Sequence, residues 1–241
     1  METENEVRAL LPSRIRDSIF NRPRRLNQYA EAIAQLFGPD RAAEEGTRFV
    51  ATNPTPGTPI ATTTSITAFT VASPIMAIVN NNGIDSGINV TLDYLRLLLS
   101  QVPTSATSWQ WLMQKDSATR YSSAGSTIVP KNVLVGAPNP TGSAGIYFGA
   151  LVAAAAGVNA RYTHRSVGRS VVGVIQDETL FKFGSPSHDG AGTLGGTVAL
   201  RVPIPCGPEV IRPGETWLLY GWGAANAAAP SWEFELGYTE R

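Results

Sequence analysis

The residues with the chemistry for catalysis or metal binding are few in this chain and lie far apart. The two histidines, His164 and His188, stand in separate contexts ("RYTHRS" and "SPSHDG") without the H-x-H spacing of a cupin-type metal centre. Zinc and similar ions need several such ligands converging on one point. The single cysteine, Cys206, lies between prolines with no histidine nearby, which indicates a small buried hydrophobe rather than a nucleophile. We therefore expect no metal and no cofactor.

Two pairs of carboxylates could in principle hydrolyse a glycosidic bond. They are Asp177 with Glu178, in a predicted turn, and Glu233 with Glu235, on one face of a predicted strand. A working pair must face its substrate across a groove roughly 5–10 Å wide, whereas these side chains are sequence neighbours on solvated surfaces. The glycine-rich "GAGTLGG" (190–196) lacks the Lys-Ser/Thr of a phosphate-binding loop. We expect no enzyme, and a cupin-type or carbohydrate-active enzyme is the weakest alternative.

Arginines concentrate near the N-terminus. Between Arg8 and Arg25, six arginines face one acidic residue, Asp17, which gives this stretch a net charge of +5. Arginine suits bidentate pairing with carboxylates at protein interfaces. The stretch has no interleaved aromatic residue other than Phe20, and such residues are typical of single-stranded nucleic-acid sites. The pattern favours a protein interface over a solvated helix face, and both over nucleic acid.

An amphipathic helix is predicted to follow from Asn21, with Pro23 in its first turn and Gly38-Pro39 after its end. A helix of about fifteen residues is marginal alone in water, so its apolar stripe must bury against a partner or the body. We expect the binding residues of this arm to be Arg22, Arg24, Arg25, Leu26, Tyr29, Ile33 and Phe37.

The composition changes sharply after the arm. Residues 1–50 carry 8 basic and 8 acidic side chains, whereas residues 51–241 carry 11 of each. Such a step marks a change of structural regime. We predict a helical N-terminal arm over 1–49, a Pro/Thr-rich extended linker over 50–67, and a β-sandwich body over 68–241.

The body is predicted to be all-β because short apolar runs alternate with turn residues. Strands are expected within 74–83, 88–102, 107–117, 143–155, 169–184, 196–206, 216–223 and 231–241. In 88–102 the apolar residues change face between Tyr94 and Leu95, which indicates burial on both sides or a β-bulge, and residues 93–101 also permit a helix. In the last strand Trp232, Phe234, Leu236 and Tyr238 alternate with polar residues and glycine, so this strand belongs in a sheet. The expected fold is a jelly-roll-like β-sandwich or barrel.

The layout resembles a known class of proteins. A short helical arm leads into "FVATNPTPGTPIA", and the β-rich body carries "PGETWLLYGWG" and a terminal "WEFELGYTER". Together these resemble virion structural proteins of tailed bacteriophages, in particular capsid decoration (cement) proteins with jelly-roll bodies. The resemblance implies a protein assembled in the host cytoplasm that sits on the outer capsid surface of the virion and ties neighbouring capsomers together.

The resemblance also implies partners: the major capsid protein and further copies of this chain, as a homotrimer or a homodimer. A neck, tail or receptor-binding component of the virion is the alternative. No run of apolar residues is long enough to cross a bilayer, and the charges balance, so we expect no membrane partner.

Overall fold

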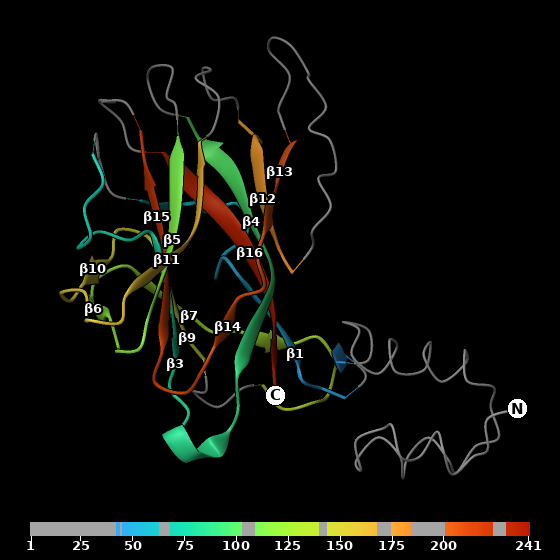
Figure 1. The fold of residues 1–241 in the computed structure, drawn as a ribbon. Coiled ribbons are helices and arrows are strands. Elements are labelled where there is room, and N and C mark those ends of the chain that lie inside the picture. Colours follow the sequence, from blue (N-terminus) through green and yellow to red (C-terminus); the bar gives the residue numbers. More distant parts are fainter. Residues whose placement is uncertain are drawn as a thin grey trace, which may run out of the picture.

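The computed structural model describes residues 42–43, 45–62, 68–102, 109–139, 144–167, 175–184, 201–223 and 230–241. They form a sandwich of β-sheets, as Figure 1 shows, with a short 3-10 helix η1 (Ile84–Ser86) between two of the strands. The strands are β1 (Arg48–Thr52), β2 (Ile60–Ala61), β3 (Met76–Asn80), β4 (Val90–Gln101), β5 (Gln110–Asp116), β6 (Tyr121–Ser123), β7 (Ser126–Ile128), β8 (Lys131–Asn132), β9 (Ala144–Phe148), β10 (Val152–Ala153), β11 (Arg161–Val167), β12 (Glu178–Phe183), β13 (Arg201–Cys206), β14 (Val210–Ile211), β15 (Thr216–Trp222) and β16 (Ser231–Glu240).

Two main sheets face each other. The eight-stranded sheet has the order β13-β12-β4-β16-β1-β8, with β14 pairing with β4 and β2 with β16, while the six-stranded sheet has the order β11-β5-β15-β3-β9-β7. A two-stranded sheet of β10 and β6 lies outside them. The pairing is antiparallel apart from that of β12 with β13, which run parallel. The predicted mainly-β, sandwich-like fold is therefore confirmed.

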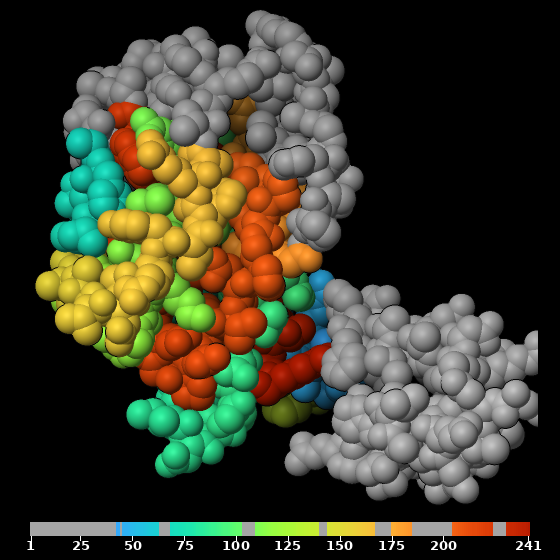
Figure 2. Space-filling model, in the orientation of Figure 1, coloured from blue at the N-terminus to red at the C-terminus, as the bar shows by residue number. Residues whose placement is uncertain are grey.

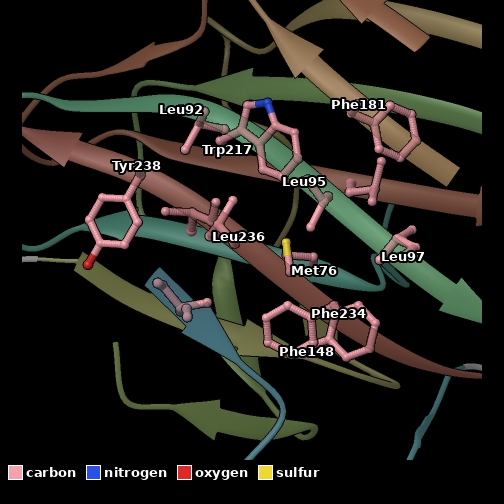
Figure 3. Packing of buried hydrophobic residues seen from close by; sticks show 14 of the residues in the cluster. Met76, Leu92, Leu95, Leu97, Phe148, Phe181, Trp217, Phe234, Leu236 and Tyr238 are labelled. Atoms are coloured by element: carbon pink, nitrogen blue, oxygen red, sulfur yellow. The ribbon is translucent and has the colours of Figure 1, made fainter. Parts of the chain in front are cut away.

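The longest strand, β4, contains the bulge that its apolar pattern allowed. In its pairing with β16, Gly237 lies opposite Tyr94 but Tyr238 lies opposite Leu92, so Asp93 is the extra residue. The bulge shifts the alternation by one residue. Leu92 and Leu95 consequently face the same core (Figure 3), and Tyr94 points to the outer face of the sheet. The helix alternative over 93–101 is wrong, because the whole segment is paired with β16 and β12.

The last strand lies in the middle of the eight-stranded sheet, between β4 and β1. Its side chains Trp232, Phe234, Leu236 and Tyr238 are buried in the core between the sheets, as their alternation predicted. Phe234 packs on Phe148 of the opposite sheet with ring centroids 4.5 Å apart. The core is thus filled by side chains from both sheets (Figure 3).

The predicted boundary between arm and linker falls inside β1. This strand pairs with β16 from Arg48 opposite Thr239 to Thr52 opposite Glu235, and Figure 2 shows the two strands, in blue and dark red, side by side. Proline excludes helix, but it does not exclude the strand that precedes it. Phe49 and Ala51 point into the core, so the described part of the predicted linker belongs to the body.

The outer face of the six-stranded sheet carries a second apolar cluster. Its members are Ala77, Leu112, Leu151, Leu218, Tyr220 and Trp222. Phe69 packs against this cluster, with its ring centroid 5.1 Å from that of Tyr220. The segments around residues 69 and 151 therefore cover this face, and the six-stranded sheet is packed on both sides.

Candidate functional site

The arm residues predicted to bind a partner lie outside the described residues. They are Arg22, Arg24, Arg25, Leu26, Tyr29, Ile33 and Phe37. Their role stays a prediction.

The outer face of the eight-stranded sheet carries a group of polar side chains, which we call the outer polar row: Tyr94, Arg96, Glu178, Glu233 and Glu235. Arg96 on β4 forms ion pairs with Glu178 on β12 at 3.1 Å and with Glu235 on β16 at 3.8 Å. The Tyr94 hydroxyl donates a hydrogen bond to Glu235, and burial, followed by this carboxylate, raises the pKa of Tyr94 well above its ordinary value. The row links three neighbouring strands across the sheet.

A shallow hollow lies beside the outer polar row. It has a volume of about 230 Å³ and is lined by Thr52, Asn53, Pro56, Arg96, Leu98, Glu233, Phe234 and Glu235. Pockets for drug-sized ligands are usually larger, about 300–1,000 Å³. Glu233 and Glu235 lie on one strand two residues apart, and each is hydrogen-bonded to a side chain of β4, Glu233 to Ser100 and Glu235 to Tyr94. This arrangement holds strands together and does not place two carboxyl groups on opposite sides of a groove.

A buried arginine cluster lies on the outer face of the six-stranded sheet. Arg120 and Asp116 are almost fully buried and form an ion pair at 3.0 Å. Arg120 also donates to Gln114 Oε1 at 3.1 Å and to the carbonyl oxygen of Ala154 at 2.8 Å. The backbone N–H of Gly157 donates to Asp116 at 2.8 Å. The cluster therefore fastens the 154–157 segment to the sheet, which is a structural role.

The same cluster includes the hydroxyl of Tyr220, which donates to the carbonyl oxygen of Val71 at 3.0 Å. Burial raises the pKa of Tyr220 to about 12. The phenol is thus neutral at physiological pH and acts as a hydrogen-bond donor. It holds the segment around residue 71 as Arg120 holds the segment around residue 154.

Of the groups that sequence analysis singled out for nucleophilic or metal chemistry, the structure describes Cys206 and His164. Cys206 ends β13, and burial raises the pKa of its thiol to about 12, so it is not a thiolate at neutral pH. His164 lies on β11, where burial lowers the pKa of its imidazole. His188 lies outside the described residues. Within the described ranges, no three His, Cys, Asp or Glu side chains gather at one point that could hold a metal ion.

A buried carboxylate, Glu209, lies just before β14. Burial raises the pKa of Glu209, while a hydrogen bond with Thr163 and the charge of Lys115 lower it. Lys115 on β5 donates to the carbonyl oxygen of Val210 and forms an ion pair with Glu215 at 3.1 Å. Because β5 belongs to the six-stranded sheet and β14 to the eight-stranded one, this lysine connects the two sheets at one end of the sandwich.

Glu209 is expected to make the stability of the fold depend on pH. Because the pKa of Glu209 is higher in the folded state than in the unfolded chain, the folded protein keeps this proton over a range where the unfolded chain has lost it. Stability therefore falls as the pH rises through that range. We expect the free energy of unfolding to fall less between about pH 4 and pH 8 in the Glu209→Gln variant than in the unchanged protein. Urea denaturation at each pH measures this free energy. Glu233→Gln is the matched control for removing a carboxylate, and an unchanged slope in Glu209→Gln would contradict the prediction.

Sequence reasoning missed the residues that organise these sites. Arg96 stands alone in the leucine-rich "YLRLLL", and a single charge inside an apolar strand was the available signal. Asp116 and Arg120 gave no signal, because their spacing of four has meaning on a helix and they lie on a strand end and a loop. Glu233 and Glu235 lie on the outer face as predicted.

No protein-family model, curated protein or solved structure matches this chain. Across the part of the chain that the structure describes, none of the helices has the length and apolar character needed to span a bilayer.

Proposed function

We propose that the protein is a non-enzymatic structural protein of a virus particle. In this proposal the body is a jelly roll that acts as a rigid module, and the N-terminal arm binds a neighbouring subunit of the shell. The place in the particle is that of a decoration protein, which bridges and stabilises neighbouring capsomers of a tailed phage by contacting its major capsid protein.

The observation that carries the proposal is the order of strand pairing. The first long strand, β1, pairs with the last, β16, and one sheet contains the order β1-β16-β4-β12. The second long strand, β3, pairs with the last but one, β15, and the other sheet contains the order β3-β15-β5-β11. Eight strands wound in two sheets in this way are the pattern of the jelly roll, which is common in viral capsid domains and also occurs in lectins and cupins. The jelly-roll order of the strands thus supports a shell protein. Because one fold serves several functions, the choice among them rests on the side chains.

The side chains favour the structural branch of that fold family. The space between the sheets is filled by apolar side chains, and the charged side chains of the outer polar row and the buried arginine cluster are held in ion pairs or hydrogen bonds. A body of this kind supplies shape and stiffness. The arm supplies arginines for carboxylate pairing and an apolar stripe for anchoring, and a few such anchors can carry most of the affinity.

The test reverses the charge of the arm in the full chain. For Arg22→Glu/Arg24→Glu/Arg25→Glu we expect binding to shells of the encoding virus, prepared without this protein, to weaken at least tenfold, or about 1.4 kcal/mol. Binding is measured by co-sedimentation. The control reverses three exposed arginines of the body, Arg161, Arg165 and Arg212, and is expected to bind normally. Undiminished binding of the arm variant would refute the role of the arm.

A second candidate function is favoured by the same pairing order: the protein forms the wall of the shell itself. Jelly rolls build capsids as well as coat them. The purified full chain should then assemble alone into closed particles, seen by electron microscopy, whereas a decoration protein should stay a small oligomer. The two candidates are thereby separated in one experiment. Nucleic acid that co-purifies with such particles, and is lost in the arm variant, would identify phosphate as the partner of the arginines.

A further inference from the structure

An exposed apolar patch lies at one edge of the eight-stranded sheet. It consists of Val129, Val133, Leu134 and Val135, whose exposed fractions are 66%, 43%, 43% and 97%. These residues flank the short edge strand β8, and we call them the 129–135 patch. Four exposed apolar side chains within seven residues are unusual on a soluble surface and mark an interaction site.

The patch lies beside the point where the arm enters the body. The side chain of Asn132 donates to the carbonyl oxygen of Gly46 at 2.7 Å, and the N–H of Val133 donates to the carbonyl oxygen of Arg48 at 3.1 Å. Gly46 also lies close to Leu134, since a Cβ atom added to Gly46 would be 3.8 Å from the Leu134 side chain. Figure 1 shows the loop after β8 next to the start of β1.

The apolar stripe of the arm ends at Phe37, nine residues before Gly46. Phe37 precedes Ala42 by five residues, which span at most about 18 Å. The stripe of Leu26, Tyr29, Ile33 and Phe37 is thus tethered within reach of the patch of its own chain. A short tether gives an effective concentration on the order of millimolar, far above that of a second copy in dilute solution.

We propose that residues 26–37 dock on the 129–135 patch of the same chain before the protein meets its shell. This inference rests on the proposed function only for the role of these residues as anchors. It adds that the anchors are covered in the free protein and must leave the body to bind elsewhere. The apparent affinity for a shell is then reduced, because only the molecules whose arm is undocked can bind.

Cross-linking in the full chain tests the docking. Ala30→Cys places a thiol on the stripe and Lys131→Cys places one at the edge of the patch, while the native Cys206 is buried. With a bismaleimide of about 8 Å, we expect an intrachain cross-link, identified by peptide mass spectrometry, in most molecules. Adding Leu134→Asp/Val135→Asp should reduce the cross-link at least about fivefold, because charges on the patch oppose burial of the stripe. The matched control Val158→Asp, at a valine that is 95% exposed elsewhere, should leave it unchanged.

Other outcomes overturn the inference. A cross-link between chains would identify a second copy as the occupant, and a cross-link that is absent or insensitive to Leu134→Asp/Val135→Asp would show that the stripe does not dock there. A thermal melt of each variant establishes that the body is folded. Shell binding by Leu134→Asp/Val135→Asp gives a second readout, since release of the arm should strengthen binding. If docking fails but the arm charge reversal still weakens shell binding, only this inference falls. If the charge reversal has no effect, the role of the arm in the proposed function falls.

Discussion

Replacing Asp116 with alanine is expected to destabilise the body by about 3–5 kcal/mol. The substitution leaves the guanidinium of Arg120 buried without the carboxylate that lies 3.0 Å away. It also removes the acceptor of the Gly157 N–H, so the 154–157 segment loses one of its attachments. Urea denaturation of the full chain measures the loss as a shift of the unfolding midpoint.

The double variant Asp116→Ala/Arg120→Met is the control for this prediction. Methionine removes the uncompensated charge while it keeps much of the side-chain volume, and such replacements of buried ion pairs are often neutral or stabilising. We expect it to recover part of the stability lost in Asp116→Ala. A loss below about 1 kcal/mol in the single variant would mean that water reaches Arg120.

Removal of β16 is expected to abolish folding. Truncation after Pro230 deletes Trp232, Phe234, Leu236 and Tyr238, and burying each such side chain contributes about 1.5–3 kcal/mol. The sum of about 6–12 kcal/mol is comparable to the whole stability of a typical domain. The truncation also leaves β4 and β1 without the strand that joins them. Circular dichroism during heating should show no cooperative transition.

Deletion of residues 1–41 is the matched control, because it removes more of the chain but keeps every strand that the structure describes. The turn in which Thr47 N–H donates to the carbonyl oxygen of Ala42 at 2.9 Å is retained. We expect this variant to melt close to the full chain. A cooperative transition in the variant truncated after Pro230 would contradict the central role of β16.

Local apolar pattern predicted the strands β3, β4, β5, β9, β12, β13, β15 and β16, because strands of a sandwich bury apolar side chains on at least one face. It did not predict β1 or β11, nor the short strands β2, β6, β7, β8 and β14. The alternation of Trp232 to Tyr238 matches their burial in the core, and the β-bulge that the pattern of residues 88–102 allowed lies at Asp93. The bulge places Tyr94 on the outer face, whereas the pattern had placed it on the face of Leu92. Neither pattern reveals partners, because pairing joins residues far apart in the chain. The parallel pairing of β12 with β13 therefore gave no sequence signal.

The partners of the polar side chains could not be predicted from the sequence for the same reason. Glu233 and Glu235 were expected on a solvated face, but their partners Tyr94 and Arg96 depend on the bulge in β4, which decides where Tyr94 points. Prolines at 54, 56 and 59 predicted a linker, whereas β1 ends just before them and pairs with β16. The residue types of a segment limit it to a few conformations, and pairing with strands far away in the chain selects one of them.

The position of β1 has a mechanical consequence. The chain is first attached to the sheet at Gly46 and Thr47, which accept hydrogen bonds from Asn132 and Glu240. From there it continues into β1, whose ladder to β16 runs from Arg48–Thr239 to Thr52–Glu235. Ladder hydrogen bonds lie perpendicular to the strands, so a pull along β1 loads them together in shear rather than unzipping them one at a time. The joint between β1 and β16 therefore resists a pull along β1 in its strongest direction.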